Sequence, residues 1–189
     1  FIFVNSPLSV TAKDGSVIQT RSESDTCYQA GLEDFNETSL KARCGKLTKE
    51  LSELLVADEC PNETLPLVIS SDQMMLQIHE SIGHALEIDR ILGDEKNYAG
   101  WSFVKMEDFG SLQYGSDLMN ITFNPTLEGE FASYDYDDSG HKAEKEFLIK
   151  DGLLVRGLGG LESQSRSGLD SVANFRASSW NRAPIDRMA

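Results

Sequence analysis

Apolar residues in the first part of the chain recur with a period of two and then with the period of a helix. Residues 1–23 alternate loosely on either side of Asp14-Gly15, a dipeptide typical of tight turns, and so predict a β-hairpin. From Ser39 to Ala57 the apolar residues follow one another at intervals of four and three, which predicts a helix with one buried face. Cys44 lies on that face, and we expect it to be a buried core thiol.

A second helix is expected from about Ser71 to Leu92, after a short buried strand at 67–69. Ser70 and Gln73 have the spacing of a capping box, and Gly93 suits the position just past the helix end. We expect the apolar cluster at residues 74–76 to pack in the core.

The rest of the chain is rich in strand-forming residues. Candidate strands cover residues 101–104, 118–123 and 130–136, and a hairpin is expected around Asp151-Gly152, between 146–150 and 153–156. The expected fold class is α+β, a mainly antiparallel sheet with two principal helices.

The pattern changes again near Gly157, where Gly, Ser and Arg become frequent. We therefore expect an α+β core over residues 1–157 and an extended arm over 158–189 that leads into a missing C-terminal region. The sequence opens without an initiator Met in a strand-like run, and we interpret it as a fragment of a larger protein.

Composition and charge exclude several classes of protein. The 189 residues are 40% hydrophobic and 25% charged, which is typical of a globular chain and not of a disordered one. Seventeen basic and thirty-one acidic residues give a net charge of −14, so a broad nucleic-acid-binding surface is not expected. No apolar run approaches the ~18 residues of a membrane span. Three cysteines without a secretion signal predict reduced thiols and a cytoplasmic location.

The candidate chemistry lies in the second helix, at His79-Glu80-Ser81-Ile82-Gly83-His84. Two imidazoles can bind zinc, and a neighbouring carboxylate can take a proton from water. In a regular α-helix, side chains five residues apart point about 140° away from each other. A one-residue π-bulge would bring His79 and His84 to the same side, and Gly83 tolerates the distortion. The motif therefore predicts an irregular helix.

Other interpretations of these residues stay open. The two histidines could be hydrogen-bonded within the helix without any metal, with Glu80 on a solvated face. Glu87, three residues beyond His84, could be a carboxylate ligand or a polar surface position.

The stretch from Gln73 to Glu87 resembles the metal-binding helix of the TldD/PmbA family, bacterial and archaeal metallopeptidases formerly known as modulators of DNA gyrase. The resemblance covers nearly the whole chain and includes segments before and after this helix. These segments are Phe3–Ser6, Leu65–Ile69, Tyr136–Gly140, the hairpin around Asp151-Gly152, and Ala183–Met188. The HExxxH pattern is typical of the TldD branch, since the PmbA-type partner usually lacks the histidines.

The resemblance implies a site and a function. His79 and His84 would bind zinc, Glu80 would be the general base, and the third ligand would be a cysteine located beyond Ala189. Cys27, Cys44 and Cys60 all precede the helix and match no family ligand. The expected activity is zinc-dependent hydrolysis of short or unstructured peptides, paired in extended form with a sheet edge. The expected partner is a PmbA-type paralogue or a second copy, and we expect the fragment alone to be inactive.

Two rival functions remain. Dipeptidyl-peptidase-III-type zinc peptidases share the H-E-x-x-x-H spacing, but they need a second, glutamate-bearing helix, and the sequence downstream of His84 shows no convincing one. A binding or assembly module would use the same histidines without a metal. The metal content of the full-length protein separates this module from both peptidases.

Overall fold

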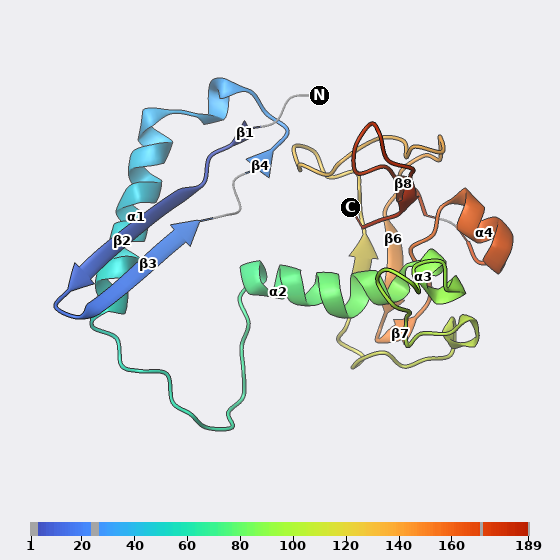
Figure 1. Ribbon diagram of the computed structural model, residues 1–189, viewed down its shortest axis with the longest axis horizontal. Helices are drawn as coiled ribbons and strands as arrows, with labels where there is room; N and C mark the ends of the chain where they lie inside the picture. Colours follow the sequence, from blue (N-terminus) through green and yellow to red (C-terminus); the bar gives the residue numbers. More distant parts are fainter. Residues whose placement is uncertain (1–3, 24–26, 171, 189) are drawn as a thin grey trace. The chain divides into compact units, whose positions relative to one another are not determined.

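The computed structural model describes residues 4–23, 27–170 and 172–188, so the expected strand residues Phe1–Phe3 lie outside the described part (Figure 1). The chain divides into two compact units. The N-terminal unit comprises Phe1–Val68 and Gly129–Phe131, and the C-terminal unit comprises Ile69–Glu128 and Ala132–Ala189. Helices are combined with antiparallel strand pairs, as the expected α+β class requires.

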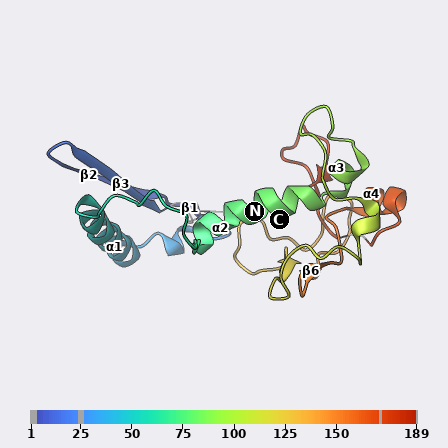
Figure 2. The same cartoon turned by 90° about the horizontal axis from the view of Figure 1, so that it is seen from below.

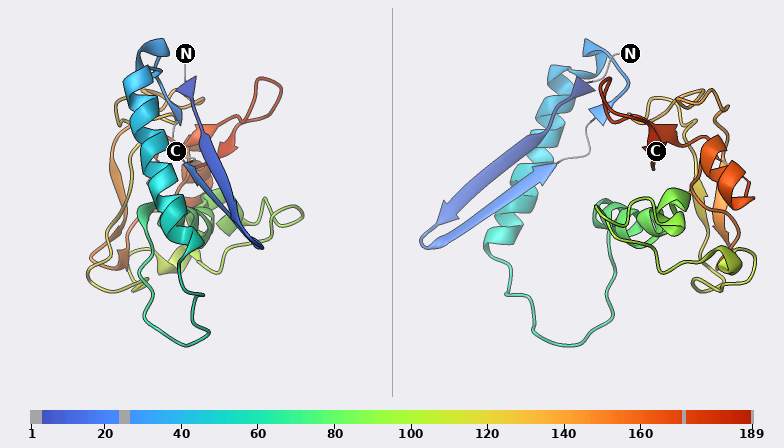
Figure 3. Two further views of the ribbon diagram at one scale, coloured as in Figure 1. Left: turned by 90° about the vertical axis from the view of Figure 1, so that its left-hand side faces the viewer. Right: turned by 45° about the vertical axis from the view of Figure 1, so that its right-hand side comes forward.

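The N-terminal unit is a hairpin covered by one helix. Strands β2 (Leu8–Asp14) and β3 (Val17–Glu23) pair antiparallel around a turn at Gly15-Ser16, one residue later than the expected Asp14-Gly15, and Gly15 has a φ of +56°. Helix α1 (Glu37–Leu55) runs along this hairpin (Figure 3). The predicted hairpin and helix are therefore confirmed. The unit also contains β1 (Val4–Asn5), β4 (Cys27–Tyr28) and the 3₁₀ turn η1 (Leu32–Asp34).

Only part of the apolar face of α1 is buried. Leu47 and Leu51 are buried, whereas Cys44 is exposed, so the prediction that Cys44 is a buried core thiol is wrong. A two-stranded hairpin is narrow and covers only a stripe of the helix. Polar contacts also join the helix to the strand segments. Arg43 donates from Nε to Glu23 at 2.7 Å and from Nη2 to the Ser6 carbonyl at 2.7 Å.

The second predicted helix is present but broken. It consists of α2 (Ser71–Ile78), a π-turn η2 (His79–Gly83), a 3₁₀ turn η3 (His84–Leu86) and α3 (Ile88–Leu92). Gly93 ends α3 in the left-handed conformation with a φ of +95°, as expected. The expected capping box is absent, since the Ser70 side chain makes no cap hydrogen bond.

The break between η3 and α3 has a tertiary cause. Glu87 is extended, with a ψ of 118°, and forms a parallel bridge with Leu158. The amide of Leu158 donates to Leu86 at 2.7 Å, and that of Ile88 donates to Leu158 at 2.8 Å. These bonds replace helical ones, so a segment about seventy residues away in sequence ends the helix.

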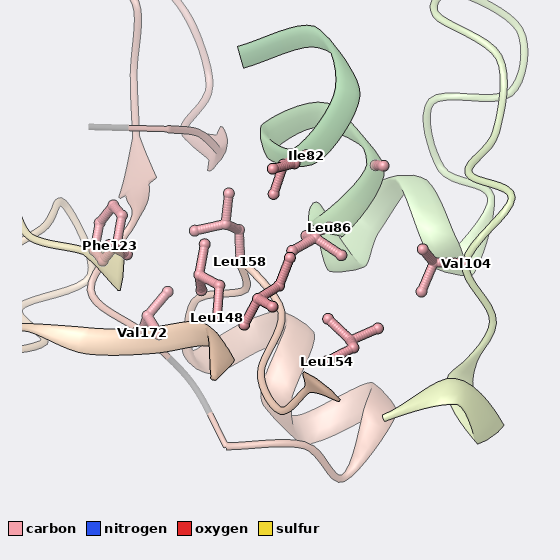
Figure 4. Packing of buried hydrophobic residues seen from close by; sticks show 10 residues of the cluster. Ile82, Leu86, Val104, Phe123, Leu148, Leu154, Leu158 and Val172 are labelled. Carbon is pink, nitrogen blue, oxygen red and sulfur yellow. The ribbon is translucent and has the colours of Figure 1, made fainter. Parts of the chain in front are cut away.

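The sheet of the C-terminal unit is small. Strands β5 (Ile121–Phe123), β6 (Glu146–Lys150) and β7 (Leu153–Leu154) pair antiparallel in that order. Asp151 and Gly152 have φ values of 50° and 78°, which suits a two-residue hairpin turn and confirms the expected hairpin. Side chains from this sheet and from the irregular helix form the core (Figure 4). Leu86, Ile149 and Leu154 are 0% exposed.

Several expected strands are not formed. Residues 67–69, 101–104 and 131–135 contain no strand, and of the expected 118–123 only β5 forms. Val68 and Trp101 are 93% and 70% exposed, so these apolar residues do not have the burial that would favour a strand. The 3₁₀ turn η4 (Met106–Asp108) lies in this loop-rich part.

Residues after Gly157 are folded, unlike the expected extended arm. They form α4 (Leu161–Ser167), which contacts α3 (Figure 2), and the pair β8 (Phe175–Arg176) and β9 (Ile185–Asp186). The expected division at residue 157 therefore differs from the observed units. The glycines here allow close packing, since a Cβ on Gly159 would lie 2.7 Å from Ile88 Cγ1. The frequent glycines suggested an extended arm, but in this segment they allow tight contact.

The same segment contributes to a buried acidic pair. Asp186 is 2% exposed and accepts hydrogen bonds from the Gly160 amide at 2.9 Å, the Asp89 amide at 3.3 Å and the Ser163 hydroxyl. Asp89 is 7% exposed, and burial, together with the charge of Asp186, raises the pKa of Asp89 to about 7. Burial raises the pKa of Asp186 as well.

We expect Asp89→Asn to remove a pH dependence of stability. The ordinary pKa of Asp89 is 3.8, so between about pH 4 and pH 7 the folded protein keeps a proton that the unfolded chain has released. Stability from this group therefore falls as the pH rises through that window. From pH 5 to pH 8 the free energy of unfolding of wild type should fall by about 2–3 kcal/mol more than that of the variant.

Urea unfolding at both pH values measures this difference. Asp117→Asn is the control, because Asp117 is exposed. An equal pH dependence in wild type and Asp89→Asn would contradict the expectation.

Candidate metal centre

The π-turn η2 brings the two histidines of the motif together. The His84 amide donates to the His79 carbonyl, five residues earlier, in place of the ordinary α-helical bond. The two imidazole rings lie 4.6 Å apart between centroids, at an interplanar angle of 82°. The predicted irregularity near residues 82–84, with both imidazoles on one side, is confirmed.

Glu80 lies in the same cluster. One ligand atom each from His79, Glu80 and His84 lies within 4.8 Å of the other two. His79 and Glu80 are exposed and His84 is partly buried, so the cluster is open to solvent. Among the residues that the structure describes, only these three form a group of three or more His, Cys, Asp or Glu side chains close enough to hold a metal.

The inner side of the π-turn packs against the core. Ile82 is 3% exposed and belongs to the core cluster, and Gly83 is buried. Met188, close to the end of the described chain, covers Gly83, and a Cβ at residue 83 would overlap its Sδ atom. Gly83 is therefore needed for this close approach as well as for a flexible backbone.

Two hydroxyl groups satisfy carbonyls of the distorted helix. Tyr114 Oη donates to the Ser81 carbonyl at 2.7 Å, and Ser102 Oγ donates to the Ala85 carbonyl at 2.6 Å. An irregular turn leaves some carbonyls without regular partners, and these contacts supply them. Burial raises the pKa of Tyr114, which keeps its hydroxyl protonated as a donor.

A buried carboxylate orients one of the histidines. The side chain of Glu87 is 6% exposed and accepts a hydrogen bond from Arg90 Nε at 3.2 Å, and Arg90 Nη2 forms an ion pair with the same carboxylate oxygen at 3.1 Å. Its Oε2 lies 3.0 Å from His84 Nδ1. Arg90 Nη2, which can only donate, also lies 3.3 Å from Nδ1. Because the contact with the ionised carboxylate, which can only accept, is shorter, we assign the proton to Nδ1 of His84. Nε2 is then left with the lone pair that a metal needs.

Glu87→Ala in the full-length protein is expected to lower metal affinity by about 10- to 100-fold, the usual effect of losing a carboxylate that orients a ligating histidine. Zinc titration against a competing chelator measures this change. Glu107→Ala is the matched control, because the Glu107 side chain is 74% exposed. Unchanged affinity in Glu87→Ala would show that the Glu87–His84 contact does not prepare the site.

The other candidate residues lie outside the cluster. Glu87 is neither a surface position nor part of the metal-capable cluster. Cys27, Cys44 and Cys60 are free thiols of the N-terminal unit, and none belongs to the cluster found among the described residues. The sequence showed no convincing helix downstream of His84, but α4 is one and carries Glu162. Glu162 pairs with Arg166 at 3.2 Å and is not in the cluster, so the dipeptidyl-peptidase-III-type arrangement gains no support.

The donor set fits a metal ion. Two imidazoles and an adjacent carboxylate are typical of zinc peptidase sites, where two histidines bind the ion and the glutamate acts on water. The third ligand expected from the family resemblance stays a prediction.

Several residues that contact the motif were not predicted from the sequence. The two interpretations of Glu87, a ligand or a polar surface position, left out a third, because its spacing of three residues from His84 allows a side-chain contact. Arg90, a further three residues on, completes that network. No local signal identifies Tyr114, Ser102 or Met188, because each reaches the helix from elsewhere in the chain.

Three comparisons with known proteins identify relatives of this chain. The profile of the PmbA/TldA metallopeptidase C-terminal domain matches residues 62–189. A metalloprotease of Methanocaldococcus jannaschii is 31% identical over 136 residues, which are 72% of this chain and 28% of the relative. A metalloprotease of Methanothermobacter thermautotrophicus is 31% identical over 183 residues, 96% of this chain and 38% of the relative.

The crystal structure of TldE from Thermococcus kodakarensis shares the fold, with a TM-score of 0.68 and 14% identity over 96% of this chain and 38% of that one. The chain thus spans only about a third of the length of the proteins it matches. No helix in the described residues combines the length and apolar character needed to cross a membrane. The sequence match, the shared fold and the paired histidines lead to one conclusion: this chain belongs to the PmbA/TldA metallopeptidase family.

Proposed function

We propose that the full-length protein is a zinc-dependent peptidase whose metal is held by His79 and His84, with Glu80 as general base. The observation that carries this proposal is the π-turn, because it gathers the donor atoms of all three residues within 4.8 Å. A regular helix of the same sequence would separate the histidines. Family membership supports a metal-dependent peptidase, and the two imidazole donors favour zinc.

The chain's own residues suit amide hydrolysis. When bound, the ion supplies Lewis acidity, which polarises a carbonyl and makes water more acidic. Glu80 would accept a proton from the water that attacks the scissile carbonyl carbon, and would then give this proton to the nitrogen as the C–N bond breaks. Glu87 and Arg90 would keep His84 in the tautomer that presents Nε2.

Short or unstructured peptides are the proposed substrates. Strand β5 is an edge strand of its sheet, paired only with β6 among the described strands. An extended peptide can add to such an edge through main-chain hydrogen bonds, whereas a folded protein cannot easily do so. A PmbA-type paralogue or a second copy is the proposed partner, and a cysteine in the remainder of the protein is the proposed third ligand. The cytoplasmic location stays a prediction.

Metal content and activity of the full-length protein test the proposal together. We expect stoichiometric zinc by elemental analysis, hydrolysis of an unstructured peptide, loss of hydrolysis on chelation and its return with added zinc. Hydrolysis that survives complete removal of metal would refute the metal-dependent mechanism. A protein that holds no metal and cleaves no peptide would instead support the binding-module alternative.

A further inference from the structure

An apolar pocket of about 480 Å³ adjoins the candidate metal centre within the C-terminal unit. Helix α2 and the π-turn form one wall, and the four consecutive residues 121–124, at and just after β5, form another. Leu148, Leu158 and Met188 complete the lining. The volume lies within the usual range for small-ligand sites and is ample for one large side chain.

The chemistry of the pocket excludes charge. No Asp, Glu, Lys or Arg is among its described lining residues, although charged residues make up 25% of the chain. The polar side chains present are Ser71, His79, Thr122 and Asn124, and the remainder are aliphatic, aromatic, methionine or glycine. An unpaired charge would be costly to bury here, whereas an aliphatic or aromatic group would be stabilised.

The position of the pocket relates it to the reaction. His79 lines the pocket, whereas Glu80 and His84 do not. The pocket therefore lies to one side of the cluster and begins at one of its histidines. A peptide whose scissile carbonyl is at the cluster has a side chain within one residue of that point on each side. One of these two side chains can enter the pocket.

We propose that this pocket is a specificity subsite that accepts an aliphatic, methionine or aromatic side chain of the substrate next to the scissile bond. The proposal rests on the proposed peptidase function and adds a substrate class to it. The subsite discriminates by excluding charge, while main-chain pairing along β5 holds the peptide independently of its sequence.

Methionines broaden the range of side chains that fit. Met74, Met75 and Met188 all line the pocket, and their unbranched, flexible side chains adapt to occupants of different shape. Met75 is 60% exposed, so it lies at the rim, not in the core as the sequence pattern suggested. Leu, Met and Phe should therefore be accepted to similar extents.

A peptide series on the wild-type, full-length protein tests the subsite. The peptides have a Gly/Ser background and differ at one position, which is Leu, Met, Phe, Ala, Asp or Lys, and mass spectrometry identifies the cleaved bond. We expect cleavage beside Leu, Met or Phe, with kcat/KM about 10- to 100-fold above the Ala peptide. Asp and Lys should be no better than Ala.

A matched pair of variants then tests whether the pocket is responsible for the preference for an apolar over a charged side chain. Met75→Lys places a positive charge at the rim and should lower the Leu-to-Asp ratio of kcat/KM at least tenfold. Leu76→Lys is the control, because Leu76 is the next residue of α2, is 53% exposed and does not line the pocket. Its Leu-to-Asp ratio should stay within twofold of wild type. A ratio within one protein is unaffected by a loss of folded material.

Binding to the Glu80→Gln variant separates failure of this inference from failure of the proposed function. Tighter binding of the Leu, Met and Phe peptides than of the Asp peptide, without cleavage in wild type, would retain the subsite and refute the peptidase. Metal-dependent hydrolysis without side-chain preference would retain the peptidase and overturn the subsite. Equal binding of all peptides, as expected if another segment of the protein fills the pocket, would also overturn it.

Discussion

Glu80→Gln in the full-length protein is expected to retain zinc while its kcat falls by about 10³-fold, within the range that a general base contributes. The amide occupies the same space but cannot accept the proton from water. Because the proposed metal ligands are His79 and His84, zinc content should remain that of wild type. Elemental analysis and steady-state peptide hydrolysis measure the two quantities on the same preparation.

Asp72→Asn is the matched control for this experiment. Asp72 is exposed on α2 and is outside the cluster, so its substitution removes one negative charge near the site without touching the proposed chemistry. Loss of zinc from Glu80→Gln would show that Glu80 is a ligand. Full activity of Glu80→Gln would exclude it from proton transfer.

His84→Ala is expected to weaken zinc binding by at least about 100-fold, more than loss of the supporting carboxylate, and to abolish hydrolysis. It removes a proposed ligand and leaves the Glu87–Arg90 pair without its third member. His141→Ala is the natural control, because His141 is the one histidine of the chain outside the motif. Equal zinc affinity in His84→Ala and wild type would refute the assignment.

The same titration tests the proposed third ligand. The 189-residue chain alone should bind zinc weakly and hydrolyse no peptide, since stable catalytic sites normally use three protein ligands. Serine substitutions of Cys27, Cys44 and Cys60 should change its affinity little. Tight, equimolar binding that disappears with one of these substitutions would identify that cysteine as the third ligand and exclude one elsewhere in the protein.

The sequence by itself determined the features that depend on neighbouring residues. The heptad-like spacing of leucines identified α1, and Asp14-Gly15 and Asp151-Gly152 identified two hairpins, because turn geometry follows from local backbone preferences. The spacing of five between His79 and His84 predicted a π-turn, because a regular helix cannot place both imidazoles on one side.

Only the tertiary structure decided which residues support the site. Leu158 ends the helix at Glu87, whose carboxylate lies 3.0 Å from His84 Nδ1, and Met188 covers Gly83. The glycines near residue 159 pack against Ile88, although their frequency suggested an extended arm. Met75 lies at a pocket rim, although its apolar character suggested the core. Each of these outcomes depends on a contact between segments far apart in the chain, and periodicity and turn chemistry contain no information about such contacts.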